Sequence, residues 1–230
     1  MKNLLLLLFC SLLLSNSTEA QQTKRYGGIG FFSFGMADLQ QPGLNAQLTA
    51  ASYTPLQSRQ LSVGGEGFGI INNFLLGGRG GSMGRQQFSS ANNTGSIQNS
   101  YGSFLLGYTF ALSKKLLFYP LVGFGGIDSE ITIENNTTSN SITAAFVNPN
   151  QITVIRAEVP ILDFSVNFAL PIIGNVNGGG GPIVGLSAGY FFSPGAGRYR
   201  MNGRDLTDIP TGQNNGFYVR LLFGGGGFGG

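Results

Sequence analysis

The segment Leu162–Phe168 reads LDFSVNF and alternates strictly between bulky apolar and polar side chains. The same period of two recurs in three more segments, where one face is bulky and apolar and the other is small or polar: 103–110, 184–192 and 217–223. Successive side chains of a β-strand point to opposite faces, so this period predicts strands with two chemically different faces. The chain is therefore expected to be all-β.

The composition is that of a membrane protein. Only 10% of the 230 residues are charged, whereas 42% are hydrophobic. A soluble surface usually carries about 25–35% charged residues, so these few charges would not cover one. No apolar run reaches the roughly 18 uninterrupted residues that a spanning helix needs. A barrel strand needs only about 9–11 residues of alternating character, with lipid on the apolar face, and the sequence has such segments.

Eight strands are predicted, and the connections between them alternate between short and long. The expected strands are 25–36, 60–71, 74–87, 97–110, 116–134, 153–170, 182–192 and 216–223. The expected short turns are 72–73, 112–115 and 171–181, and the long polar loops are 37–59, 88–96, 135–152 and 193–215. This arrangement predicts an eight-stranded antiparallel up-and-down transmembrane β-barrel, with its long loops outside and its short turns in the periplasm.

Three stretches with different expected roles divide the chain. Residues 1–20 have Lys2, an apolar core and a small residue at Ala20, which is the pattern of a cleaved secretory signal peptide. Residues 21–223 are assigned to the barrel, and 224–230 to a Gly-rich C-terminal tail. Within the first long loop, apolar residues at helical spacing predict a short helix over 42–51.

Several chemistries are excluded by residues that the sequence lacks. There is no His, so neither a Ser-His-Asp triad nor an HExxH zinc site can form. The single Cys, Cys10, lies in the leader and excludes Cys-rich zinc sites and internal disulfides. No basic run is longer than two residues, which argues against nucleic acid as a partner. We therefore expect no enzymatic activity, no cofactor and no bound metal.

Four charges are predicted to point into the barrel, because their parity places them opposite apolar neighbours. They are Glu66, Arg79, Asp163 and Arg220. A buried charge is very costly unless it is paired, so two acids and two bases on one inner face predict an interior charge network. An eight-stranded interior is just wide enough to be filled by side chains. The sequence therefore favours a structural plug over a gated pore.

Gly and Tyr residues have expected places in the same barrel. The fragments GGEGFG (64–69) and GGRGG (77–81) precede no helical pattern, so they are interpreted as sites of strand curvature rather than phosphate loops. Six tyrosines near strand ends or faces are candidates for an interfacial aromatic girdle, with ordinary strand packing as the alternative: Tyr26, Tyr101, Tyr108, Tyr119, Tyr190 and Tyr218. The charges of the last loop, from Arg198 to Asp208, are interpreted as a solvated loop or as a surface for an anionic partner.

The segment Asn214–Leu221 reads NNGFYVRL and is similar to the polar-x-Gly-x-x-apolar-x-apolar signal of a last barrel strand. With the strand pattern, it makes the chain resemble the small eight-stranded outer-membrane β-barrel family of Gram-negative bacteria. The resemblance implies export to the outer membrane, lipid contact and recognition by the barrel assembly machinery through Asn214, Gly216, Val219 and Leu221. The family's few lipid-modifying enzymes rely on His, so no catalytic residue is transferred to this chain.

The sequence leaves three functions open. The favoured one is a monomeric outer-membrane barrel with a non-enzymatic envelope-structural or surface-binding role, its long loops contacting an unknown extracellular ligand. The second is a narrow small-solute channel or transport accessory, which requires a wet path past the interior charges; the barrel is too narrow for an open porin-like channel. The third is an exported soluble β-barrel that binds an apolar ligand. That last hypothesis predicts the reverse parity, with apolar residues inside and polar residues outside.

Overall fold

The computed structural model describes residues 24–135, 152–176, 178–207, 210 and 214–229; the expected signal peptide and most of the 135–152 loop lie outside them. The elements are β1 (Tyr26–Gln40), α2 (Pro42–Ala50), β2 (Arg59–Ile71), β3 (Phe74–Met83), β4 (Gln86–Ser89), β5 (Asn93–Tyr108), β6 (Phe110–Ser113), β7 (Leu116–Asn135), β8 (Ile152–Pro171), β9 (Gly179–Phe192), β10 (Arg198–Met201), β11 (Arg204–Asp205) and β12 (Asn215–Gly229). Among the described residues, no helix is long and apolar enough to cross a membrane.

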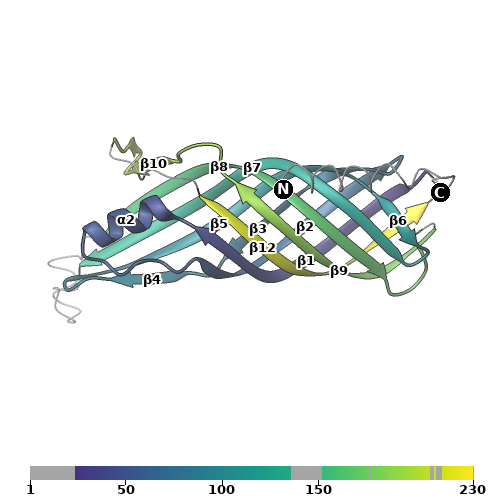
Figure 1. The fold of residues 1–230 in the computed structure, drawn as a ribbon, viewed down its shortest axis with the longest axis horizontal. Helices are drawn as coiled ribbons and strands as arrows, with labels where there is room; N and C mark the ends of the chain where they lie inside the picture. The colour runs from purple at the N-terminus through teal and green to yellow at the C-terminus, as the bar shows by residue number, and fades with distance from the viewer. Residues whose placement is uncertain (1–23, 136–151, 177, 208–209, 211–213, 230) are drawn as a thin grey trace, which may run out of the picture.

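Eight of the strands close into an antiparallel barrel, which confirms the predicted fold (Figure 1). Their order around the ring is β1, β2, β3, β5, β7, β8, β9 and β12, and β12 pairs with β1 to complete it. Two short strands extend this ring. β4 continues the line of β3 along β5, and β6 continues the line of β5 along β7.

The connections sort to the two ends of the barrel as expected. The C-terminus and β6 lie at one end, here called the turn end, whereas α2, β4 and β10 lie at the other, the loop end (Figure 1). The tightest turn is at Asn72 and Asn73, whose φ angles of 52° and 69° are both positive. A type I′ hairpin requires positive φ at both central residues, and Asn tolerates it better than most residues do.

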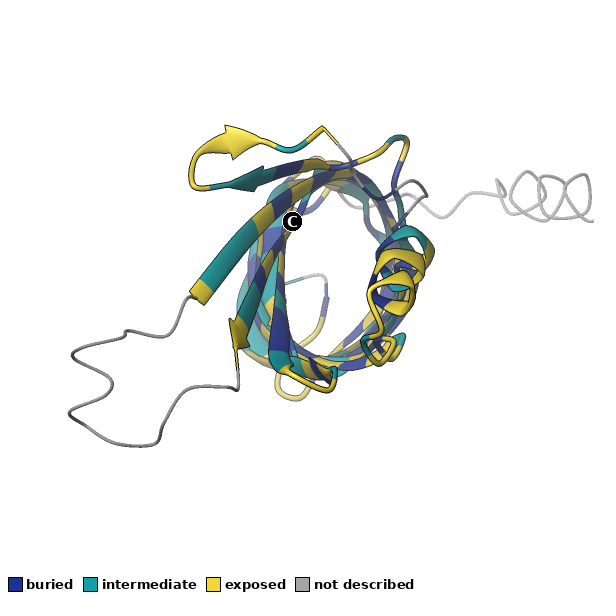
Figure 2. Ribbon diagram, turned by 90° about the vertical axis from the view of Figure 1, so that its left-hand side faces the viewer, coloured by how far each residue is buried: buried dark blue, intermediate teal, exposed yellow. Residues whose placement is uncertain are grey.

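Helix α2 forms within one residue of its predicted range and covers the loop end. Pro42 occupies its first turn, where the missing N–H costs nothing. Leu44 and Leu48 are buried in a small core with residues from β4, β5 and β7, including Phe88 and Ile131. Figure 2 shows the helix lying at the rim of the strand ring. This core lies at the loop end of the barrel.

The described residues 224–229 do not form the separate Gly-rich tail that the sequence predicts, because they belong to strand β12. Strand β12 continues through Gly229, pairing with β1 down to Tyr26 and with β9 down to Gly179. Phe228 is buried in the turn-end core. A run of glycines has no side chains to alternate, so parity could not mark these residues as a strand, although their backbone pairs like any other.

The two faces of the strands differ as the sequence predicts. Each barrel strand presents exposed apolar side chains outward, and we call this band the apolar belt. Representative members are Phe32, Leu61, Leu76, Phe104, Val122, Phe164, Leu186 and Val219. Facing inward at the turn end is an apolar core that includes Ile29, Phe68, Leu75, Leu117 and Leu222. Polar and charged side chains fill the layer above it.

The glycines are of two kinds, which explains why the chain has so many. A Cβ at the inward-facing Gly125 would lie 1.8 Å from the backbone oxygen of Gly102, the neighbouring strand being in the way. A Cβ at the outward-facing Gly102 would meet nothing within 4 Å. Inward glycines are thus required for close strand approach in a narrow barrel, whereas some outward ones are not.

Candidate functional site

All four charges predicted to face inward are buried in the barrel: Glu66, Arg79, Asp163 and Arg220. Glu66 on β2 and Arg79 on β3 are directly paired in register, and Arg79 Nε lies 2.5 Å from Glu66 Oε2. Arg79 Nη1 also lies 3.2 Å from Asp163 Oδ2, on β8 at the far side of the interior. The structure therefore joins three of the four predicted residues by ion pairs.

Arg79 is the centre of a wider polar cluster that crosses the barrel. It donates a hydrogen bond to the Tyr218 hydroxyl, and longer ones of 3.4 Å to Asn167 Oδ1 and Ser187 Oγ. Tyr218 in turn donates to Asp163 Oδ1 at 2.6 Å. These residues, with Glu66, are called the Arg79 cluster below. They tie together β2, β3, β8, β9 and β12, which are distant in the sequence.

Arg220 does not join this network, which corrects the prediction of a four-residue ion cluster. Its Cζ lies 3.9 Å from the ring centroid of Tyr218 and 4.5 Å from that of Tyr101. None of its guanidinium nitrogens has a hydrogen-bond partner among the described residues. Parity identified the face on which Arg220 lies, but the aromatic rings, rather than a carboxylate, receive its side chain.

Three of the six tyrosines that are candidates for an interfacial girdle lie elsewhere. Tyr101, Tyr119 and Tyr218 are buried inside the barrel. Tyr26, by contrast, is exposed at the turn end. The signal was present for Tyr218, because it lies two residues before Arg220 and so shares its inward face.

The turn end is closed by a connection for which the sequence predicts only a short Gly-rich turn at 171–181. Arg25 Nε donates to the Val176 carbonyl at 3.0 Å, and its backbone N–H donates to Asn73 Oδ1 at 3.2 Å. The Val176 backbone N–H donates to the Lys114 carbonyl at 3.0 Å, and its side chain is fully buried in the turn-end core. The β8–β9 connection thus folds across the mouth of the barrel.

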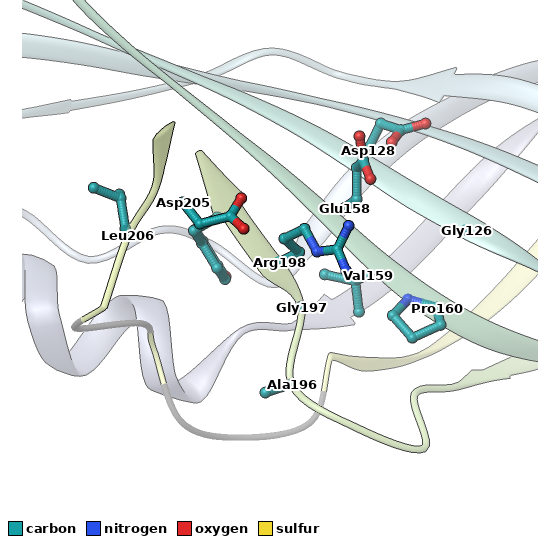
Figure 3. Close-up of a pocket in the computed structure, with 11 residues that line it drawn as sticks. Gly126, Asp128, Glu158, Val159, Pro160, Ala196, Gly197, Arg198, Asp205 and Leu206 are labelled. Atoms are coloured by element: carbon teal, nitrogen blue, oxygen red, sulfur yellow. The ribbon is translucent and has the colours of Figure 1, made fainter. Parts of the chain in front are cut away.

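A cleft of about 690 Å³ lies at the loop end, between the outer face of β7 and β8 and the β10–β11 hairpin (Figure 3). Asp128 on β7 and Glu158 on β8 are directly paired in register, and Arg198 pairs with Glu158 from the other side. The remaining walls are Gly126, Val159, Pro160, Ala196, Gly197, Tyr199, Asp205 and Leu206. The cleft therefore presents carboxylates and a guanidinium beside apolar walls.

Ion pairs hold the hairpin that forms one wall of this cleft. Arg200 Nε lies 2.9 Å from Asp205 Oδ1, and its Nη1 lies 3.8 Å from Glu158 Oε1. The hydrogen bond to Asp205 raises the pKa of Arg200, and burial raises the pKa of the Tyr199 phenol. Both groups thus keep their protons at neutral pH. Within the described residues, no group of three or more His, Cys, Asp or Glu is placed to hold a metal ion.

The predicted assembly signal lies where β12 begins. Val219 and Leu221 face outward in the apolar belt, whereas Gly216 is buried and Asn214 precedes the strand. A Cβ at Gly216 would lie 2.6 Å from the Asp38 carbonyl oxygen of β1. Close approach of β12 to β1 therefore explains why residue 216 is a glycine. Recognition of the predicted signal by the assembly machinery stays a prediction.

No family model matches the sequence, and neither does any curated protein. Solved structures give matches of low identity. The attachment invasion locus protein Ail of Yersinia pestis is 12% identical, with 88% of this chain and 98% of that chain covered and a TM-score of 0.44. Outer membrane protein OprG of Pseudomonas aeruginosa is 10% identical (90% and 96% covered, TM-score 0.42), and outer membrane protease OmpT of Escherichia coli is 8% identical (92% and 99% covered, TM-score 0.28).

Proposed function

We propose that this protein is an integral outer-membrane β-barrel with a non-enzymatic role, either in envelope structure or in surface binding through its outer loops. The apolar belt is the observation that carries the proposal. Val122 on β7 is 49% exposed and Phe217 on β12, three strands farther around the ring, is 68% exposed. Soluble monomers rarely expose contiguous apolar patches larger than a few hundred Å², whereas lipid favours such a surface.

The polarity change along β7 and β8 supports the same proposal. The belt includes Phe124 on β7 and Phe164 on β8, and the next outward charges toward the loop end on these strands are Asp128 and Glu158. This order is expected where a barrel leaves the hydrocarbon and enters the polar headgroup layer. The soluble-barrel hypothesis required polar residues outside, and the belt contradicts that requirement.

The filled interior supports a structural role over a channel. The Arg79 cluster crosses the middle of the barrel, an apolar core fills the turn end, and Val176 folds across the mouth there. Aqueous channels belong to barrels of about 16–18 strands. We expect no discrete conductance steps from the purified protein in planar bilayers, and reproducible steps would revive the channel hypothesis.

The partners follow from the same proposal. Outer-membrane lipid contacts the belt, and the barrel assembly machinery reads the start of β12 during biogenesis. The barrel works as a monomer, because its own strands close the ring and leave no open edge between them. We propose the loop-end cleft of Figure 3 as the contact site for an extracellular ligand, because it presents carboxylates and a guanidinium beside apolar walls.

The experiment that tests the proposal is envelope fractionation followed by a denaturing gel of unboiled and boiled samples. We expect the protein in the outer-membrane fraction, and we expect the unboiled sample to migrate differently because the barrel stays folded in detergent. Urea-washed membranes serve as the control for peripheral attachment. A protein found wholly in the soluble periplasmic fraction would end the outer-membrane proposal.

A further inference from the structure

The loop-end cleft carries opposite charges on its two sides. Asp128 of β7, Glu158 of β8 and Arg198 of β10 lie in register on three neighbouring strands. Neighbouring strands are about 4.8 Å apart, so about 10 Å separates the backbones of Asp128 and Arg198. All three side chains line the cleft (Figure 3). The cleft is therefore negative on its β7 side and positive on its β10 side.

The charges on both sides of the cleft are available to a ligand. Within the described residues, neither the Asp128 carboxylate nor the Arg198 guanidinium has an ion pair or a side-chain hydrogen bond. Glu158 between them has only the 3.8 Å contact with Arg200. Asp128 and Glu158 are like charges directly opposite each other, an arrangement that destabilises a sheet. A cation that donates hydrogen bonds to both carboxylates removes this repulsion.

The β10 side of the cleft is suited to a phosphate group. Arg198 also lines a second hollow of about 470 Å³, together with Arg156 and Arg200. Arg156 pairs with Glu130 and Arg200 with Asp205, whereas Arg198 keeps all its N–H donors for a ligand. The guanidinium fork matches the oxygens of a phosphate and binds them in pairs. We therefore expect the anionic part of a ligand at Arg198.

The cleft is continuous with the apolar belt. The outward positions of β7 run from Phe124 in the belt through Gly126 to Asp128, and Gly126 is paired with Pro160 of β8. Gly126 and Pro160 both line the cleft. A Cβ at Gly126 would lie 3.6 Å from the Val159 backbone oxygen, an ordinary contact, so this glycine faces open space. A hydrocarbon chain on the belt can therefore pass Gly126 and lead to a headgroup in the cleft.

These features together specify a class of ligand. The cleft volume of about 690 Å³ is within the usual range for small-molecule sites. We propose that the loop-end cleft binds the headgroup of a membrane lipid that carries both a primary ammonium and a phosphate, as phosphatidylethanolamine does. The ammonium lies between Asp128 and Glu158, the phosphate lies at Arg198, and the acyl chains lie on the belt. This inference rests on the proposed function, because it requires the belt to be in lipid, and it names the ligand class of the cleft.

Lipid binding to the full-length protein in non-ionic detergent, measured by native mass spectrometry, tests the proposal. The probes are dioctanoyl phosphatidylethanolamine, phosphatidylcholine and phosphatidylglycerol, which share the phosphate and differ in the rest of the headgroup. The choline group is a cation without an N–H donor, and glycerol has no charge. Phosphatidylethanolamine should bind about tenfold more tightly than either, which corresponds to one hydrogen bond between charged groups. Binding of phosphatidylethanolamine no tighter than that of the other two lipids overturns the proposal.

Two substitutions in the cleft separate the contributions of the ammonium and the phosphate. Asp128→Asn should abolish the preference for phosphatidylethanolamine and leave the binding of the other two lipids unchanged. Arg198→Gln should weaken all three about tenfold, because the phosphate is common to them. The matched controls Glu134→Gln and Arg204→Gln are exposed and line neither hollow, so both should bind like the unsubstituted protein. If either cleft variant binds like its control, the proposal is wrong.

Two further observations distinguish a lipid from a soluble ligand and this inference from the proposed function. Glycerophosphoethanolamine has the same headgroup without acyl chains and should bind at least about tenfold more weakly, because each buried CH₂ contributes about 0.8 kcal/mol. Equal affinity for it would assign the cleft to a soluble zwitterion and overturn the lipid assignment. An unboiled gel confirms that each variant is folded. A folded protein in the outer-membrane fraction without lipid preference overturns this inference alone, whereas a protein in the soluble fraction overturns the proposed function as well.

Discussion

Replacing Arg79 with methionine tests whether the Arg79 cluster stabilises the barrel. Glu66 Oε2 accepts from Arg79 alone in the described structure, and Glu66 Oε1 has no partner there. Asp163 loses one ion pair but keeps the hydrogen bond from Tyr218. The Arg79→Met barrel thus contains a buried carboxylate without a partner, and its interior charge falls from zero to −1.

The magnitude follows from the burial of both partners, whose side chains are fully inaccessible. Removing one member of a buried ion pair costs about 3–5 kcal/mol, because the other charge is left uncompensated. The second substitution Glu66→Gln restores an interior charge of zero, since Asp163 and Arg220 remain. We expect the Arg79→Met/Glu66→Gln double variant to recover at least about 1–3 kcal/mol, the cost of an unsatisfied buried polar group, which is larger when that group is charged.

The free energy of unfolding is measured by far-ultraviolet circular dichroism in urea and detergent, because the chain has no Trp to report by fluorescence. Arg59→Met is the matched control, since its ion pair with Asp38 is 3.9 Å long and largely exposed. An exposed pair is worth about 0–1 kcal/mol. If Arg79→Met costs no more than Arg59→Met, or if the double variant recovers nothing, the cluster does not stabilise the barrel as described.

Three other substitutions test separate parts of the fold. Gly125→Ala should abolish the folded band on unboiled gels, because its Cβ would lie 1.8 Å from a backbone oxygen. The control Gly102→Ala should keep that band, since its Cβ would meet nothing within 4 Å. Equal behaviour of the two variants would contradict the two classes of glycine. Truncation after Phe223 removes the pairing of β12 with the start of β1. A protease should then cut that end of β1 faster than in the full chain. Unchanged digestion would count against a strand at 224–229. Val122→Arg in the belt should destabilise the barrel in lipid vesicles by about 2–4 kcal/mol, and the control Glu130→Arg above the belt should destabilise it far less. Equal destabilisation by the two substitutions would mean that the belt does not face lipid.

The strands could be predicted from the sequence because lipid and a narrow interior impose opposite chemistry on successive residues. LDFSVNF at 162–168 places Asp163 inside and Phe164 outside, and the structure confirms both. The hairpin at Asn72 and Asn73 could be predicted for another reason. A two-residue hairpin turn needs two successive positive φ angles, which Asn tolerates and few other residues do.

The partners of the interior charges could not be predicted in the same way. Parity gives the face of a residue but not the reach of a long side chain across a barrel, so Arg220 was expected at a carboxylate and lies between Tyr rings instead. The C-terminal boundary of the last strand could not be predicted, because the residues of GGGGFGG show no alternation of side-chain polarity. The loop-end cleft depends on how β10 joins β8, which no local pattern specifies.

Cysteine accessibility on intact Gram-negative cells tests the central claim most directly. Single cysteines replace Glu130 above the belt, Val122 within it and Leu112 at the turn end, in a chain whose Cys10 is changed to Ser. A membrane-impermeant maleimide should label Glu130→Cys on intact cells and Leu112→Cys only after the outer membrane is permeabilised. Val122→Cys should stay unlabelled until the barrel is unfolded. Labelling of Val122→Cys on intact cells to the same extent as Glu130→Cys would contradict an apolar belt embedded in the outer membrane.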